Sequence, residues 1–244
     1  MSKQNIDPTV YQEQKVWGLE GNEDYFTSHR SRPDHLYRSE KFFLPEVLAR
    51  VDDCLDVGCA CGDFSAIFKN YNPQIKYTGV DIIERFVRIS RQRYPQERFE
   101  LSDGISLDFP DRSFDLVHSS GILHLNSRYA DIVREMYRVA KCYVLCDFRL
   151  TDGPDVVGEL DVNLVGQEGA AQTLPYYVVN ITQHLEFLKS LVPAPDRIEV
   201  KGYVHPPSKS ARVATDKIYM AFFLITKSPQ DNSGPTEIKV NLDL

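Results

Sequence analysis

The sequence predicts an α/β domain in which a mostly parallel, doubly wound sheet carries helices on both of its faces. From about residue 53 onward, short β-rich runs alternate with segments of helical periodicity. Such an alternation is typical of parallel strands that are joined by crossover helices. Because these crossovers are right-handed, we expect the ligand crevice outside the carboxyl ends of the strands.

Length and composition agree with a single domain. The 244 residues suffice for one α/β core, and the contents of 42% hydrophobic and 26% charged residues are ordinary for a globular protein. Polar residues gather at both ends, in residues 1–7 and in Ser228–Thr236. We expect both segments to be loose.

The parallel part of the sheet is predicted from five apolar runs. They are Cys54–Val57, Tyr77–Asp81, Arg98–Leu101, Phe114–His118 and Tyr143–Phe148. Amphipathic helices are predicted between them at Asp63–Tyr71 and Arg128–Val139, and we interpret their apolar stripes as core.

The alternation ends after the fifth strand. The irregular, glycine-containing stretch Thr151–Asn180 predicts an insertion. A helix at Ile181–Leu191 and two strands at Arg197–Val204 and Ile218–Thr226 are expected to complete the sheet.

Three regions follow from this order of elements. Residues 1–50 are expected to form an N-terminal lid and a first helix, and residues 51–227 the main domain with its insertion at about 151–180. Residues 228–244 are expected to be a flexible C-terminal tail.

Charge and cysteine content narrow the class of protein. The formal net charge of −7 argues against nucleic acid as a partner, because such binding requires many Lys and Arg residues on one surface. No apolar run is long enough to span a bilayer, and the first residues lack the pattern of a signal peptide. With five cysteines in apolar surroundings, we expect a cytoplasmic protein with reduced thiols, no disulfide and no metal.

A glycine-rich turn follows the first strand. The segment Gly58-Cys59-Ala60-Cys61-Gly62 has small residues at alternate positions, which lets the backbone turn tightly and approach a ligand beside a helix N-terminus. Dinucleotide enzymes also carry such turns, and a purely structural turn is the simpler alternative. The segment lacks the Gly-x-Gly-x-x-Gly spacing that is expected for a pyrophosphate.

Two acidic residues follow the next two strands. Asp81 lies about twenty residues beyond the glycines, where a carboxylate can accept hydrogen bonds from a ribose diol. Asp103, in Ser102-Asp103-Gly104, ends the third strand and can accept from an adenine amino group. The alternative is that both are helix caps or solvated loop acids.

The ordered series LDVGCACG, GVD, SDG and FDLVHSSGILHL resembles the large family of seven-stranded, S-adenosylmethionine-dependent methyltransferases with a Rossmann-like fold. The resemblance spans about residues 40–150. It implies S-adenosyl-L-methionine as the cofactor. One position departs from the family pattern, since Ala60 replaces the middle glycine of the loop.

The resemblance also implies which residues contact the cofactor. They are Asp56 under the amino-acid moiety, Gly58, Cys59, Ala60 and Gly62 around the methionine portion, Asp81 with Ile82 at the ribose, Asp103 and Gly104 near adenine, and Ser119 in the pocket.

A sulfonium already activates its methyl group, so the protein must align the acceptor and, for a hydroxyl, remove a proton. His124, after the fourth strand, is the first candidate base, and His205, at the end of the sixth strand, is the second. Either could instead only pack. His118 and Asp147 are interpreted as structural residues within or at the end of their strands.

The acceptor is expected to be a small polar metabolite that is methylated on oxygen or nitrogen. The polar and aromatic stretch Trp17–Tyr37 is a candidate lid, with Tyr25, His29 and Arg30 as substrate contacts together with Tyr176 of the insertion. A solvated helix is the alternative for this stretch. Two other functions stay open, a nucleic-acid or protein methyltransferase and a nonenzymatic nucleotide-binding domain. Nothing in the sequence indicates an oligomeric state.

Overall fold

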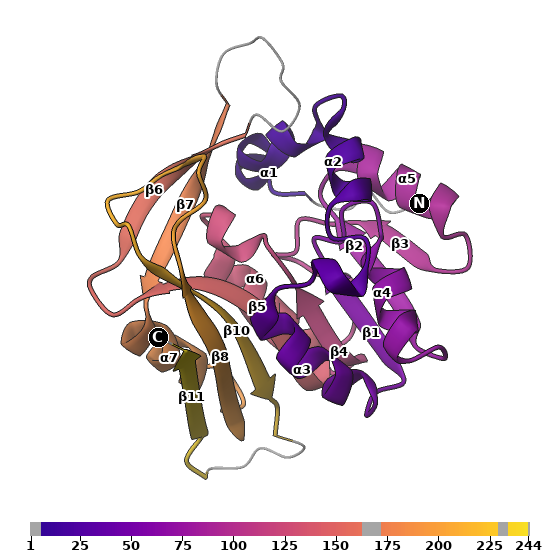
Figure 1. Cartoon of the computed structure of the whole chain (residues 1–244). Coiled ribbons are helices and arrows are strands. Elements are labelled where there is room, and N and C mark those ends of the chain that lie inside the picture. The colour runs from indigo at the N-terminus through magenta and orange to yellow at the C-terminus, as the bar shows by residue number, and fades with distance from the viewer. Residues whose placement is uncertain (1–5, 163–171, 229–233, 244) are drawn as a thin grey trace.

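The computed structural model describes residues 6–162, 172–228 and 234–243, and Figure 1 shows one extended sheet with helices around it. The strands are β1 (Asp53–Val57), β2 (Lys76–Asp81), β3 (Arg98–Leu101), β4 (Phe114–Ser119), β5 (Ala140–Thr151), β6 (Val156–Asp161), β7 (Thr173–Asn180), β8 (Arg197–His205), β9 (Ala211–Arg212), β10 (Ile218–Thr226) and β11 (Glu237–Asp243). The helices are α1 (Pro8–Gln14), α2 (Asn22–Ser28), α3 (Arg38–Leu48), α4 (Phe64–Tyr71), α5 (Glu84–Arg93), α6 (Tyr129–Val139) and α7 (Ile181–Lys189), with short 3-10 turns η1 (Lys15–Gly18), η2 (Pro33–His35) and η3 (Leu123–Leu125).

The order of strands in the main sheet is β11-β8-β10-β5-β4-β1-β2-β3. The strands from β3 to β5 are parallel, whereas β10 runs antiparallel to both β5 and β8. The sheet therefore reverses its winding between β1 and β4, and this switch point is where an open α/β sheet forms its ligand crevice. The predicted doubly wound α/β fold is confirmed.

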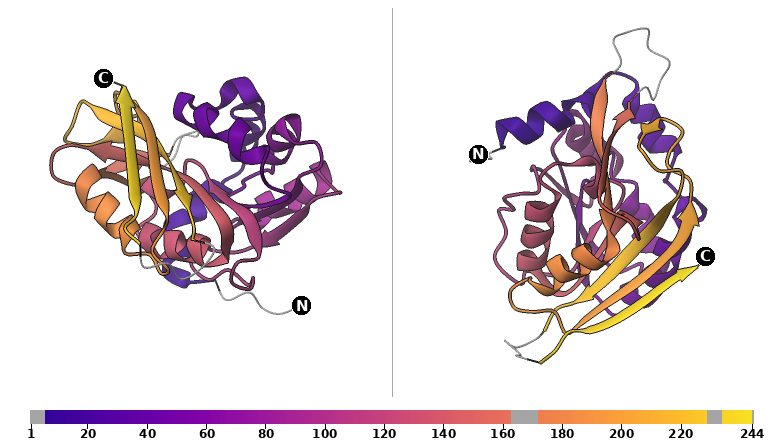
Figure 2. Two further views of the ribbon diagram at one scale, coloured as in Figure 1. Left: turned by 90° about the horizontal axis from the view of Figure 1, so that it is seen from below. Right: turned by 90° about the vertical axis from the view of Figure 1, so that its left-hand side faces the viewer.

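Side chains alternate between the two faces of the sheet and meet different helices on each. Leu55 and Val117 belong to the core with α6 and α7, whereas Cys54 and Leu116 belong to the core with α3, α4 and α5. Figure 2 shows these helices on the two sides of the sheet. Burial on both faces explains why the central strands read as continuous apolar runs.

The predicted insertion follows the fifth strand, but its described part is a regular ribbon and not the irregular stretch that was expected. β6 and β7 pair antiparallel, from Val156 opposite Val178 to Asp161 opposite Thr173, and β9 adds to β6. In Figure 1 this ribbon stands beside α1 at one end of the sheet. Residues 163–171 lie outside the described part of the chain. The sequence did not predict this ribbon because β6 contains glycine and acidic residues and has no fully buried position.

The predicted flexible tail is wrong as well for residues 237–243. β11 pairs in parallel with β8, from Glu237 opposite Arg197 to Asp243 opposite Tyr203. This pairing satisfies the backbone groups that the edge of β8 would otherwise leave unpaired. Ile238, Val240 and Leu242 recur with period two, which is a strand signal. The polar stretch before them led to the prediction of a flexible tail instead.

The N-terminal segment packs over the end of the sheet. Val16 joins a core cluster with Leu125 of η3 and with Leu174, Tyr176 and other residues of the β6–β7 ribbon. The N-terminal segment and the insertion thus enclose one end of the molecule together. Within the described residues, the helices are all too short or too polar to cross a bilayer.

Candidate functional site: two adjoining cavities

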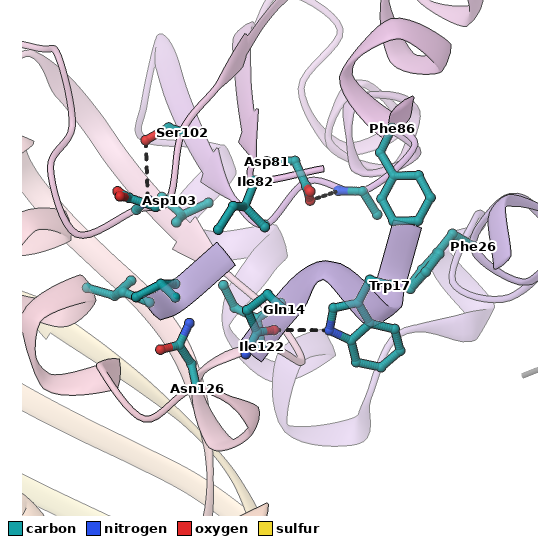
Figure 3. Close-up of a pocket in the computed structure, with 16 residues that line it drawn as sticks. Gln14, Trp17, Phe26, Asp81, Ile82, Phe86, Ser102, Asp103, Ile122 and Asn126 are labelled. Carbon is teal, nitrogen blue, oxygen red and sulfur yellow. Dashed lines mark hydrogen bonds between the residues drawn. The ribbon is translucent and has the colours of Figure 1, made fainter. Parts of the chain in front are cut away.

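A pocket opens where β1, β2 and β3 end, between these strands and the N-terminal segment, as Figure 3 shows. Its volume is about 70 Å³. The strand ends contribute Val57, Gly58, Ala60, Asp81, Ile82, Ser102, Asp103 and Gly104. The N-terminal segment contributes Val10, Gln14, Trp17 and Phe26, and Phe86, Ile122, Asn126 and Ile132 complete the wall.

The loop after β1 takes a conformation that favours glycine. Gly58 and Gly62 have φ values of 80° and 82°, and Ala60 between them has 45°. These angles lie in the left-handed region, which costs a residue with a Cβ about 1–2 kcal/mol. A Cβ on Gly58 would lie 2.8 Å from the side chain of Ile122. The loop therefore comes close to the pocket wall because glycine stands at position 58.

Asp81 joins this loop to the end of β2. Its Oδ2 accepts the Ala60 N–H at 2.9 Å, and its Oδ1 accepts the Ile83 N–H at 2.9 Å. Burial raises the pKa of Asp81 to about 6, although these backbone hydrogen bonds oppose the rise. Each carboxylate oxygen has a second lone pair, so Asp81 can still accept from a ligand in the pocket.

Asp103 holds two segments together at the other end of the pocket. Its Oδ1 accepts the Ile105 N–H at 3.0 Å, and its Oδ2 accepts the backbone N–H of Asp7 at 2.8 Å. The residue is 7% exposed and lines the pocket. Asp81 and Asp103 therefore both bind the backbone of their loops and line the cavity. A structural role for these acids is thus compatible with a role in ligand binding.

The N-terminal wall is linked to the domain by side chains. Gln14 donates from Nε2 to the carbonyl oxygen of Leu125 at 2.8 Å and accepts from Trp17 Nε1 at 3.1 Å. The Trp17 ring meets Phe26, which in turn meets Phe86 of α5 at a centroid distance of 5.1 Å. The predicted lid began at Trp17, and the sequence analysis missed Val10 and Gln14 of α1 because a short polar helix has no strong signal.

Of the predicted cofactor contacts, Gly58, Ala60, Asp81, Ile82, Asp103 and Gly104 line the pocket. Four others lie behind it. The Cys59 side chain packs on Gly79, Gly62 packs on Phe99, and Ser119 is fully buried. Asp56 is also buried, and its carboxylate accepts from Tyr77 Oη at 2.5 Å and bonds to His118 Nδ1 at 2.8 Å.

His118 extends this buried network toward the N-terminal segment. Its Nε2 lies 3.3 Å from Glu40 Oε1, and Glu40 Oε2 accepts from Arg30 Nη2 at 2.6 Å. Burial lowers the pKa of His118, but the carboxylates of Asp56 and Glu40 outweigh it and raise the pKa to about 9. The expected structural role of His118 is confirmed, since the protonated ring bridges two buried acids.

A second cavity of about 440 Å³ adjoins the first, and Trp17 lines both. Its wall includes Tyr25, Arg30, His124, Tyr176 and His205, which the sequence analysis singled out. His29 is the exception. It is exposed, and its ring stacks on Tyr25 at a centroid distance of 4.4 Å.

The two candidate bases differ in environment. His124 is buried, and burial together with the positive charge of Arg149 holds its pKa well below the usual value. The ring is therefore neutral at neutral pH. His205 is exposed, and its Nδ1 lies 2.5 Å from the carbonyl oxygen of Pro206.

Arg149 is the main lining residue that the sequence analysis missed. It lies in β5 among apolar residues, is 5% exposed, and donates from Nη1 to Asp147 Oδ2 at 2.6 Å. The other oxygen of Asp147 accepts the Gly121 N–H at 2.6 Å, which agrees with the structural role expected for this acid. An arginine inside an apolar strand was a usable signal, because a buried cation needs a partner.

The strand order, the glycine turn at β1 and the acidic residues after β2 and β3 define a Rossmann-like nucleotide-binding fold of the methyltransferase type. Residues 55–142 match a family that is described as a methyltransferase domain. The resemblance predicted from the motifs is therefore confirmed over residues 55–142.

Relatives in sequence match little more than a third of the chain. The chain is 33% identical over 89 residues to demethylmenaquinone methyltransferase of Deinococcus radiodurans, which is 35% of the chain and 37% of that relative. It is 32% identical over 94 residues to trans-aconitate 2-methyltransferase of Variovorax paradoxus, 38% of the chain and 35% of the relative. The match thus spans little more than a third of either relative.

Solved structures cover more of the chain at lower identity. The 1,6-didemethyltoxoflavin-N1-methyltransferase of Burkholderia thailandensis, with S-adenosylhomocysteine bound, has a TM-score of 0.58 at 17% identity, over 93% of this chain and 94% of that one. The [4+2]-cyclase SpnF has a TM-score of 0.59 at 17% identity, over 94% of this chain and all of that one. These similarities establish the fold.

Proposed function

We propose that this protein transfers the methyl group of S-adenosylmethionine to an oxygen or nitrogen of a small polar acceptor. The observation that carries the proposal is the pair of adjoining cavities. The smaller has the glycine loop and two acids, and the larger has polar side chains and two histidines. The cofactor supplies an activated methyl group, so the chain has to bind, orient and exclude water.

The residues of the smaller cavity fit such a cofactor. Asp81 has free lone pairs for ribose hydroxyls, and Asp103 with Gly104 offers a polar site for adenine. The left-handed turn at Gly58 brings the backbone close to where the methionine portion would lie. The N-terminal segment closes this pocket on one side with Val10, Gln14, Trp17 and Phe26.

On the acceptor side, His124 is the first candidate for a general base, with His205 as the second. Both line the larger cavity. A neutral imidazole can accept a proton at every physiological pH, which suits His124, but its lowered pKa also makes it a weak base. We therefore assign proton removal to His124 only for an acidic hydroxyl.

Two other functions remain as alternatives. A nucleic-acid methyltransferase is disfavoured by the net charge of −7 and by the lack of an Asn-Pro-Pro-Tyr type motif. The second alternative is a nonenzymatic nucleotide-binding domain, which would bind the cofactor without turnover. We propose the cytoplasm as the setting, where the five free cysteines would stay reduced.

Binding and turnover test the proposal in two steps. Calorimetry should detect S-adenosylmethionine and S-adenosylhomocysteine but not NAD, and tight NAD binding without S-adenosylmethionine binding would contradict it. Mass spectrometry of a metabolite extract incubated with cofactor should then reveal a methylated product. His124→Ala should slow transfer by about 10²–10⁴-fold if the residue is the base, and by much less if it only packs.

A further inference from the structure

The larger cavity is rich in side chains that donate hydrogen bonds. Two arginines, Arg30 and Arg149, line it together with the tyrosines Tyr25, Tyr37, Tyr176 and Tyr203. Among the described lining residues, Asp161 alone carries a carboxylate, and it is paired with Arg212. A lining that mostly donates suits a ligand that mostly accepts.

Both guanidinium groups are fixed by acids that stand behind the cavity wall. Glu40 Oε2 lies 2.6 Å from Arg30 Nη2, and Asp147 Oδ2 lies 2.6 Å from Arg149 Nη1. Glu40 and Asp147 are fully buried. Because the ion pairs order both arginines in advance, a ligand that binds them loses less conformational entropy.

Two nitrogens of the Arg30 guanidinium make no direct hydrogen bond within the described ranges. Its Nη2 donates to Glu40 and to Ser120 Oγ, whereas Nε and Nη1 are buried without a hydrogen-bond partner in the described part of the chain. Its Cζ lies 4.1 Å from the centroid of the Tyr37 ring. A buried donor without an acceptor costs about 1–3 kcal/mol, so a ligand oxygen placed at either of these nitrogens would be favoured.

Part of the remaining wall is apolar and aromatic, next to the polar residues Ser208, Ser210 and His205. Ile218 and Met220 of β10 and Leu125 of η3 line the cavity, and Tyr176 meets His124 edge to face at a centroid distance of 5.3 Å. Such surfaces accept the flat, apolar body of a ligand whose charged group is held at the arginines.

We propose that the acceptor is a small carboxylate on a flat apolar body, and that Arg30, supported by Arg149, binds the carboxylate group. The inference deepens the proposed function and rests on it, since it names the acceptor class for the same cavity. A cationic sulfonium in the adjoining pocket would add to the attraction for an anion.

The first test uses the unaltered protein saturated with S-adenosylhomocysteine. Benzoate is titrated against the neutral isosteres benzamide and benzyl alcohol, with affinity measured by ligand-observed NMR. Benzoate should bind at least about tenfold more tightly than either, the ratio that one retained charge-assisted hydrogen bond provides. Equal affinities, or a preference for benzyl alcohol, would overturn the inference and favour a neutral acceptor.

Variants of Arg30 then test whether this residue binds the carboxylate. Arg30→Gln should weaken benzoate binding about tenfold or more, whereas the exposed Arg32→Gln should not change it. If Arg30→Gln unfolds because Glu40 loses its partner, the double variant Arg30→Gln/Glu40→Gln removes both charges together. If either folded variant binds benzoate as tightly as the unaltered protein, Arg30 does not bind the carboxylate.

Binding of S-adenosylhomocysteine distinguishes a failure of the proposed function from a failure of the proposed acceptor class. All folded variants should bind S-adenosylhomocysteine as the unaltered protein does, because Arg30 lies outside the lining of the smaller pocket. If the unaltered protein does not bind S-adenosylhomocysteine at all, the proposed function fails. If it binds that ligand normally but does not prefer benzoate, only the acceptor class fails.

Discussion

At the scale of single residues, the site depends on carboxylates that serve the fold and the pocket together. Asp81 accepts two backbone hydrogen bonds and Asp103 accepts three, and both residues line the cavity. The motif positions of both acids could be read from the sequence. Their backbone partners could not, because Asp7 lies 96 residues from Asp103 along the chain.

Asp81 should control cofactor affinity and its dependence on pH. Asp81→Ala should weaken S-adenosylhomocysteine binding by about 1–3 kcal/mol, the range for a hydrogen bond to a charged group. Ribose hydroxyls favour the ionised carboxylate, whose pKa in the free protein is about 6. Affinity should therefore be full above that pH and fall below it.

Calorimetry between pH 5 and pH 8 checks this, since the interval of about three units brackets the titration. Asp81→Asn should abolish the pH dependence, and the exposed Asp108→Ala should leave both affinity and pH dependence intact. A pH-independent affinity in the unaltered protein would remove the carboxylate from the site.

His118 should contribute to stability only while it is protonated. Its pKa is about 9 in the folded protein and about 6.5 in the unfolded chain. Because the folded pKa is the higher one, the contribution is complete below pH 6.5 and is lost as the pH rises through about 9. The free energy of unfolding should fall over this window.

Denaturant unfolding measures this effect. His118→Leu should cost about 3–5 kcal/mol, because it leaves Asp56 and Glu40 buried without their shared cation. His29→Leu, a change at an exposed histidine, should be close to neutral. Equal stabilities for the two variants would show that the buried network contributes nothing.

At the scale of elements, the N-terminal segment lines the smaller pocket as well as the larger cavity. The sequence predicts that Trp17–Tyr37 closes over the cleft and contacts the substrate. In the structure α1 and η1 bring Gln14 and Trp17 to the smaller pocket, while Tyr25 and Arg30 line the larger cavity. The position of a short polar helix depends on its tertiary contacts, because such a helix is marginal alone.

Trp17→Ala should therefore weaken both functions. The variant loses the ring contact with Phe26 and the hydrogen bond to Gln14, so the pocket wall is no longer held. Cofactor affinity should fall about tenfold, equivalent to about 1.4 kcal/mol, and turnover should fall with it. Tyr11→Ala on the exposed side of α1 is the control and should change neither.

At the scale of the whole molecule, one part of the sheet forms the pocket and the other contributes to stability. The end with β1 to β4 carries the pocket, whereas β11 closes the edge beside β8 far from it in strand order. Deleting residues 229–244 should lower the free energy of unfolding by about 1–3 kcal/mol and leave cofactor affinity unchanged. Thermal unfolding and calorimetry test this, and a truncated protein with full stability would mean that β11 adds nothing.

The sequence by itself determined the parts of this protein that depend on local pattern. The strands at Arg98–Leu101 and Ile218–Thr226 were predicted to the residue, since apolar runs between turns mark buried strands. The glycine turn and its two acids were likewise readable, because their spacing follows from the strand–turn–helix unit.

Only the tertiary structure decided what depends on distant partners. β11 is a strand because the edge of β8 offers it hydrogen bonds, and the β6–β7 ribbon is ordered against the N-terminal segment. Arg30 meets Glu40 and Ser120 because three elements converge there. Buried charges and backbone polar groups need partners, and here these partners lie far away in the sequence. A local sequence pattern therefore does not predict such contacts.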